Sequence, residues 1–192
     1  KSRCYGGTFD ARNRFQTLSH GYDFGAGLTW EETFTNILDE LLFEDAGGIT
    51  INHPSWSHLT FEETCSMLDF DPRVLGMEIF TDGCIPEEEW SVELWDQVLR
   101  SGRRAFGFSV PDHMVNTQRP RGKNMLLVPD YTEYACLRAY RTGAFFCALH
   151  GDGLAFTRIE HKGNKLTIEL NQAAEVRIIV SGKEAYAAKT EG

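Results

Sequence analysis

GGITINHP, residues 47–54, is the stretch of sequence that best indicates the fold class of this chain. The two glycines predict the end of a preceding helix, since glycine commonly follows the last helical turn. Residues 49–51 are Ile-Thr-Ile, a β-branched run that predicts a short buried strand. His53 and Pro54 follow directly, so an imidazole is expected at the end of that strand. The stretch therefore predicts a helix, a tight turn and a strand that carries a functional residue at its end.

The helix before this stretch is predicted to begin after Thr29, with Glu32 completing a capping box. Its apolar residues follow the i, i+3, i+4, i+7 spacing of an amphipathic helix. Similar helix and strand patterns recur downstream. The expected helices span 60–68, 88–100 and 132–142, and the expected strands span 74–80 and 105–110. Alternating helices and short buried strands predict an α/β domain with a mainly parallel sheet or barrel.

The two ends of the chain differ from this pattern. Residues 1–27 have no clear period and are expected to form an irregular lead-in. Residues 165–170 and 176–180 alternate apolar and polar side chains, which predicts half-buried antiparallel strands. We therefore expect an α/β domain over 1–160 and a C-terminal β appendage over 161–192.

Composition limits the classes of partner. The 192 residues include 19 Lys and Arg against 28 Asp and Glu, for a formal charge of −9, which disfavours nucleic acid as a general partner. No apolar run approaches the ~20 residues of a membrane span, and no signal peptide is recognisable, so no membrane partner is expected. The five cysteines include no CxxC pair, which favours a reducing, cytoplasmic location.

Polar residues that can bind metal lie at the ends of three of the expected strands. They are His53, Glu78 and the adjacent pair Asp112 and His113. Ligands of parallel α/β folds bind at the carboxyl ends of the strands, so these side chains are expected to share one edge. Imidazole and carboxylate together suit Zn, Mn or Fe, which activate water for hydrolysis. Taken singly, each residue also has a structural interpretation, as a turn histidine, a strand-end carboxylate or a turn cap.

A basic segment follows the Asp-His pair. Arg119, Arg121 and Lys123 stand out in an acidic chain, and guanidinium groups suit a substrate phosphate. We expect them to contact the phosphate of a small phosphorylated substrate. The alternative interpretation is a solvated basic loop.

Several of these segments, in this order, resemble elements of the PHP (polymerase and histidinol phosphatase) family of metal-dependent phosphoesterases. Residues 47–54 resemble its glycine pair, strand and His-Pro element. Residues 76–80 are similar to its next strand, and residues 95–102 to the end of a helix with a Trp-Asp pair. Residues 107–113 resemble the strand that leads to an Asp and a His ligand, and residues 139–146 a late Gly-x-Phe element.

The resemblance implies a distorted barrel of seven strands and helices with two or three divalent ions at its mouth. It implies hydrolysis of a phosphate ester by a metal-activated water. By position, His53 and Asp112 match metal ligands, His113 stands near a ligand histidine, and Glu78 lies where the family often has a polar or ligand residue. Asp112 and His113 are the residues expected to be catalytic as well.

This sequence departs from the family pattern in two places. The family's N-terminal His-x-His strand is not recognisable here, and the family's Asp-x-His pair is replaced by adjacent Asp112 and His113. The chain begins at Lys1, so either the front of the barrel precedes that residue or the chain is a degenerate relative that binds without hydrolysis. A hydrolase acting on an amide or carbamate is a third possibility. We expect the chain alone to bind metal weakly or incompletely.

Overall fold

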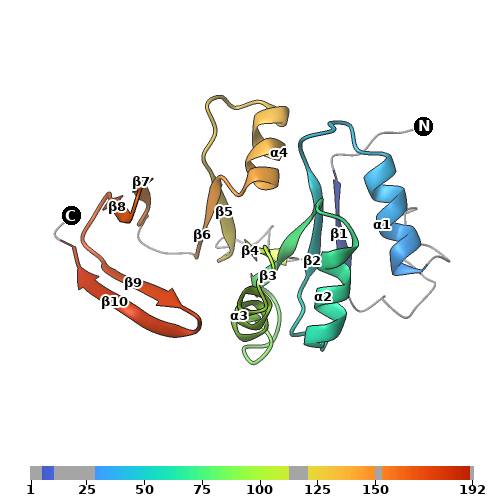
Figure 1. The fold of residues 1–192 in the computed structure, drawn as a ribbon, viewed down its shortest axis with the longest axis horizontal. Coiled ribbons are helices and arrows are strands. Elements are labelled where there is room, and N and C mark those ends of the chain that lie inside the picture. The colour runs from blue at the N-terminus through green and yellow to red at the C-terminus, as the bar shows by residue number, and fades with distance from the viewer. Residues whose placement is uncertain (1–5, 11–28, 113–120, 150–152, 191–192) are drawn as a thin grey trace.

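A four-stranded parallel sheet forms the centre of the fold (Figure 1). The computed structural model describes residues 6–10, 29–112, 121–149 and 153–190. The strands are β1 (Gly6–Asp10), β2 (Gly48–Asn52), β3 (Val74–Thr81) and β4 (Phe106–Val110), which lie in the order β1-β2-β3-β4 and pair in parallel. Their carboxyl ends therefore share one edge of the sheet.

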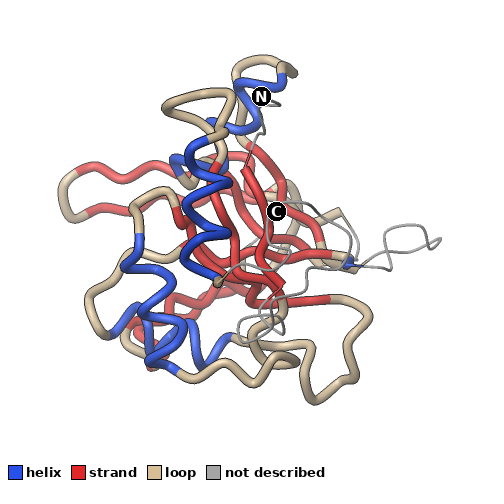
Figure 2. Tube along the Cα trace, turned by 90° about the vertical axis from the view of Figure 1, so that its right-hand side faces the viewer, coloured by secondary structure: helices blue, strands red, loops and turns tan. Residues whose placement is uncertain are grey.

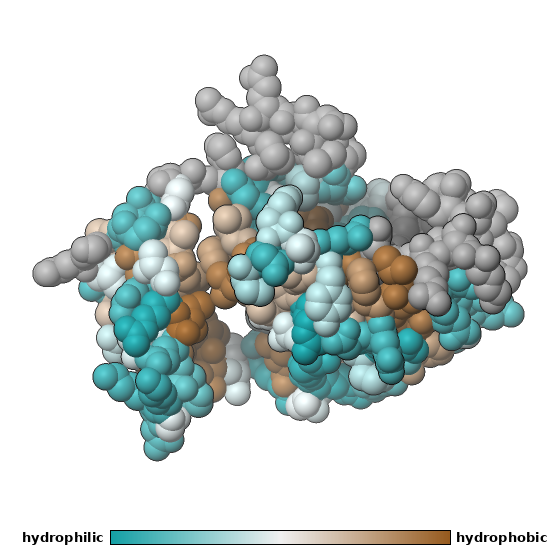
Figure 3. Space-filling view, turned by 90° about the horizontal axis from the view of Figure 1, so that it is seen from above, coloured by the Kyte–Doolittle hydropathy of each residue, from teal (hydrophilic) through white to brown (hydrophobic). Residues whose placement is uncertain are grey.

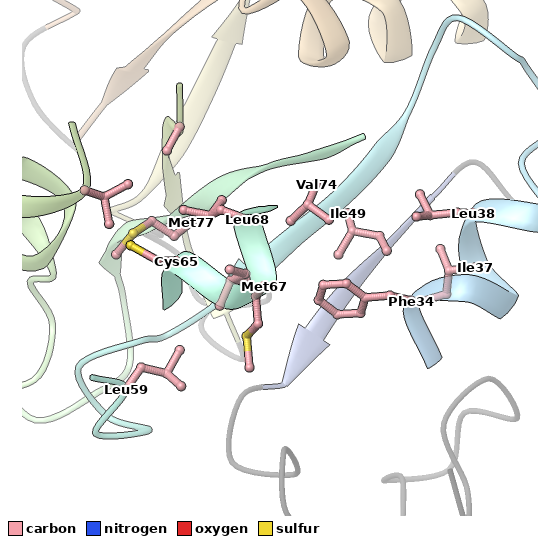
Figure 4. Close-up of a cluster of buried hydrophobic side chains, with 13 residues drawn as sticks. Phe34, Ile37, Leu38, Ile49, Leu59, Cys65, Met67, Leu68, Val74 and Met77 are labelled. Carbon is pink, nitrogen blue, oxygen red and sulfur yellow. The ribbon is translucent and has the colours of Figure 1, made fainter. Parts of the chain in front are cut away.

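Three helices connect these strands: α1 (Trp30–Asp39), α2 (Phe61–Phe70) and α3 (Val92–Arg100). The capping box predicted at Thr29 and Glu32 is confirmed, and Thr60 and Glu63 form a second one. Apolar side chains of the helices pack on Ile49 and Ile51 of the sheet, and the core they form is shown in Figure 4. At its centre Phe34 is fully buried, so α1 is fixed on the sheet by its apolar stripe.

The rest of the described chain forms antiparallel ladders. Strands β5 (Lys123–Leu126) and β6 (Phe145–Ala148) pair with one another, and α4 (Glu133–Thr142) connects them. Two hairpins follow, β7 (Phe156–Lys162) with β8 (Lys165–Leu170) and β9 (Glu175–Val180) with β10 (Lys183–Lys189).

The expectation of a distorted seven-stranded barrel is wrong. In the described part of the chain the parallel sheet is open, four strands wide and accompanied by four helices, and the remaining strands form separate two-stranded ladders (Figures 1 and 2). The parallel repeat stops at β4, because β6 returns antiparallel to β5 after α4. No closed barrel exists among these elements.

Two smaller expectations also need correction. The lead-in over 1–27 contains strand β1, and α3 begins at Val92 rather than at residue 88. The backbone before α3 is tied to β3, since the N–H groups of Thr81 and Ser91 donate to the carbonyls of Glu89 and Ile79. The expected antiparallel strands near 165–170 and 176–180 are confirmed as β8, which pairs with β7, and β9, which pairs with β10. The division at residues 160 and 161 stays a prediction.

The C-terminal hairpins are less buried than the parallel sheet. Large apolar side chains on them are half exposed, among them Ile159, Leu166, Ile179, Val180 and Tyr186. Figure 3 shows brown, apolar surface between teal patches in the part of the molecule that contains these hairpins. Across the described residues, no helix is both long and apolar enough to cross a membrane.

Candidate functional site

The carboxyl edge of the parallel sheet is the candidate site. Strands β2, β3 and β4 end at Asn52, Thr81 and Val110, and a polar residue follows each strand closely. We use "the carboxyl edge" for the groups gathered there, which are His53, Glu78, Asp82, Cys84, Glu89, Asp112 and Arg121. Ligand sites of open parallel sheets form at this edge, because the loops there can diverge around a ligand.

His53 and Glu78 are in direct contact. The backbone N–H of His53 donates to Oε2 of Glu78 at 2.6 Å, and the hydroxyl of Thr81 donates to the same oxygen at 2.9 Å. Both His53 and Glu78 are buried, each 5% exposed. The sequence predicted His53 and Glu78 at the ends of neighbouring strands. The hydrogen bond from His53 to the Glu78 carboxylate brings the two residues together.

The imidazole of His53 is held in place from two sides. Its Nδ1 lies 2.9 Å from the hydroxyl oxygen of Ser57, and its ring meets Trp56 edge-on with centroids 4.8 Å apart. The backbone of His53 has φ 32°, a conformation that is uncommon outside glycine. Fixing one ring nitrogen in this way sets the direction of the other, as ligand and catalytic histidines require.

Asp112 belongs to the same edge. It follows β4 by two residues, is exposed, and has φ 44°. Burial, together with the nearby negative charges of Asp112 and Glu78, raises the pKa of the Cys84 thiol to about 11. The two carboxylates therefore act electrostatically on one thiol. Cys84 itself is therefore a poor thiolate nucleophile.

Arg121 forms a bridge over two buried carboxylates. Its backbone N–H and its Nε donate to Asp82 at 2.8 and 3.0 Å, and its Nη2 donates to both Asp82 and Glu89. Burial raises the pKa of Asp82, but the bonds and charge of Arg121 outweigh it, so the net pKa is lowered. The guanidinium also lies 5.2 Å from the ring centroid of Phe80. Arg121 thus neutralises much of the acidic charge at this edge.

Lys123, which was also predicted to contact a phosphate, is not among the groups of the carboxyl edge. Lys123 is the exposed first residue of β5. His113 and Arg119 lie outside the described residues. Contact of Arg119, Arg121 and Lys123 with a phosphate stays a prediction, and in this structure Arg121 donates to carboxylates.

The donor types at the edge suit a divalent ion, since imidazole and carboxylate bind Zn, Mn and Fe. Within the described ranges, however, no three His, Cys, Asp or Glu side chains are grouped closely enough to hold a metal ion. His53, Glu78 and Asp112 therefore provide part of a ligand set, and the geometry does not complete one.

Sequence reasoning missed three members of this edge: Asp82, Cys84 and Glu89. Asp82 was overlooked because β3 is one residue longer than expected and ends at Thr81. Glu89 was assigned to a helix over residues 88–100, whereas it precedes α3, is buried, and shares the guanidinium of Arg121 with Asp82. The signal for Asp82 was its place one residue after a strand, the same signal that identified His53. Asp10 also ends a strand here, opposite Asn52 in the β1–β2 register.

No family model, no curated protein and no solved structure matches this chain. The resemblance to the PHP family therefore stays a prediction, and the site is judged on its own geometry.

Proposed function

We propose that this chain belongs to a metal-dependent phosphoesterase and that its carboxyl edge forms part of the hydrolytic site. The observation that carries the proposal is the direct contact of His53 with Glu78, made between the ends of adjacent parallel strands. Asp112, two residues after β4, adds a second carboxylate whose negative charge acts on the same thiol, Cys84, as that of Glu78. The proposed substrate is a small phosphate ester.

Each residue has a distinct role in this proposal. Glu78 supplies a buried carboxylate whose position is fixed by His53 and Thr81. His53 supplies an imidazole that Ser57 and Trp56 orient. Asp112 is exposed at the carboxyl edge and supplies a carboxylate that can bind the same ion as the substrate. A divalent ion bound there would supply an activated water and polarise a phosphoryl oxygen.

The test measures Mn²⁺ binding and p-nitrophenyl phosphate hydrolysis with the same protein. The proposal predicts that Glu78→Gln and Asp112→Asn each weaken Mn²⁺ affinity by about 10–100-fold, as loss of a ligand or its partner does. Turnover of p-nitrophenyl phosphate is expected to fall in the same two variants. Glu93→Gln, which removes an exposed carboxylate from the first turn of α3, is the control and leaves both unchanged. Equal Mn²⁺ affinity in all four proteins would contradict the proposal.

A second candidate function is a binding module that holds a ligand without hydrolysing it. Two observations favour it: the described residues do not complete a metal site, and Arg121 donates to Asp82 and Glu89. Metal-dependent binding of phosphate without turnover, altered by Glu78→Gln, would select this function over the phosphoesterase.

We also propose a reducing, cytoplasmic location. Cys65, Cys84, Cys136 and Cys147 are all free thiols, which persist where glutathione keeps cysteines reduced. Quantitative labelling of these thiols in protein taken rapidly from cells would test it, and oxidised cysteines would contradict it.

A further inference from the structure

Three arginines converge at the opposite end of the parallel sheet, where its strands begin. Arg73 immediately precedes β3, and Arg104 lies two residues before β4. Arg141, in the last turn of α4, donates from Nε to the carbonyl of Gly47, just before β2. Figure 1 shows α4 beside the loop that leads into β2. We call Arg73, Arg104 and Arg141 the arginine cluster.

The cluster has more positive charge than the described residues balance. Arg73 makes a two-point ion pair with Asp71. Arg104 and Arg141 form no ion pair with any described carboxylate, whereas every other arginine in the described part forms one. Two guanidinium charges therefore remain uncompensated by direct contact in a chain whose overall charge is −9.

The partners of these two guanidinium groups are neutral carbonyl oxygens. Arg141 donates to the carbonyls of Gly47 and Ala46, and Arg104 donates to that of Pro72 at 3.5 Å. A guanidinium has five N–H donors, so each group retains donors beyond these bonds. Arg104 is exposed and lies 5.1 Å from the centroid of the Phe106 ring, which supports it from one side.

The arginines are close enough to repel one another. Burial lowers the pKa of Arg141, the charges of Arg73 and Arg104 lower it further, and Asp71 and Asp45 offset part of this effect. Asp45 is itself paired with Arg138. An anion placed among the three groups would relieve this repulsion.

We propose that the arginine cluster binds a phosphate-type dianion at the amino end of the sheet. Two uncompensated guanidinium groups match a dianion in charge, and guanidinium forks match the geometry of phosphate oxygens. This site is separate from the carboxyl edge and does not depend on the proposed hydrolysis. Its ligand is a free phosphate or the phosphate group of a small molecule.

The test is isothermal titration of the intact chain with inorganic phosphate, in a phosphate-free buffer that contains EDTA. EDTA removes any metal-mediated binding at the carboxyl edge. Arg104→Gln is expected to weaken phosphate binding by about tenfold or more, the range for losing a charged hydrogen bond. Arg104→Lys is expected to lie between Arg104→Gln and the unchanged chain, because it keeps the charge and loses the fork. Acetate, a monoanion, is expected to bind more weakly than phosphate.

Two controls keep the result specific. Arg103→Gln alters the adjacent arginine, which is paired with Asp69, and is expected to leave phosphate binding unchanged. Glu78→Gln changes the carboxyl edge and is also expected to leave phosphate binding at the arginine cluster unchanged. This proposal and the proposed function can therefore fail separately. Absence of phosphate binding at millimolar concentration would overturn the proposal. Equal affinity in Arg104→Gln and the unchanged chain would overturn it as well. Circular dichroism checks that each variant folds.

Discussion

The two ends of the parallel sheet carry opposite charge and hold it in different ways. At the carboxyl edge, Glu78 and Asp82 are almost fully buried, and each accepts several hydrogen bonds. At the amino end, Arg104 is exposed and Arg141 donates to neutral carbonyls. The carboxyl edge thus supplies its own cation, Arg121, whereas Arg104 and Arg141 of the arginine cluster form no ion pair with a described carboxylate.

This difference shows how one sheet can separate two kinds of site. Burying a carboxylate costs several kcal/mol unless donors compensate it, so the acidic groups come with bonded partners. An exposed guanidinium stays hydrated, so it does not carry this cost of burial and is free to bind an external anion. Asp82, Arg104 and Arg121 lie in segments between the helices and strands, whereas Glu78 lies in β3 and Arg141 in α4. Between the two ends, β2 and β3 share one apolar core.

The largest effect is expected from disrupting that shared core. Phe34 is fully buried and makes edge-to-face contacts with Trp30 and Phe70. Phe34→Ala is expected to lower the free energy of unfolding by about 3–5 kcal/mol, which urea denaturation measures. Phe70→Ala, at a ring that is 37% exposed, should cost clearly less. Equal losses would show that α1 does not pack on the sheet as described.

A smaller effect is expected from removing the cation at the carboxyl edge. Arg121→Ala leaves Asp82 and Glu89 buried without their guanidinium, so unfolding should become easier by about 2 kcal/mol. Arg121→Lys keeps the charge and loses the two-point contact, so its loss should be roughly 1 kcal/mol. An Arg121→Ala chain as stable as the original would mean that the bridge contributes nothing.

The pH dependence of stability should reveal the same bridge. Because the pKa of folded Asp82 is lowered, its contribution is present above the unfolded value of about 3.9 and is lost as pH falls through the folded value. The stability difference between the unchanged chain and Asp82→Asn should therefore shrink as pH falls below about 4. A difference that stays constant with pH would refute the ionic character of this bridge.

Local signals in the sequence predicted most of the helices. Thr29 with Glu32, and Thr132 with Gly143, mark helix ends through bonds between near neighbours, and the structure has these caps. Strand β1 was missed because residues 6–10 include two glycines and no alternation. The barrel was wrong because the direction of β6 depends on its pairing with β5, and no local pattern specifies that pairing.

The candidate site was only partly predictable. His53 and Glu78 were found because each was expected near the carboxyl end of a strand, and the structure brings them together. Arg121 was expected to face a substrate, yet it donates to Asp82 and Glu89, which lie 39 and 32 residues away in the sequence. The arginine cluster joins the starts of two strands to the end of α4, a proximity that only the fold creates.

At the carboxyl edge, the negative charges of Asp112 and Glu78 both act on the Cys84 thiol. The direct test is the pH dependence of Cys84 alkylation, followed by mass spectrometry of its peptide. We expect an apparent pKa of about 11 for Cys84 in the unchanged chain, and a lower value in both Glu78→Gln and Asp112→Asn. Glu93→Gln, on α3, should leave it unchanged. An apparent pKa near the ordinary thiol value of about 8.5, or no change in either carboxylate variant, would show that Asp112 and Glu78 do not act on Cys84.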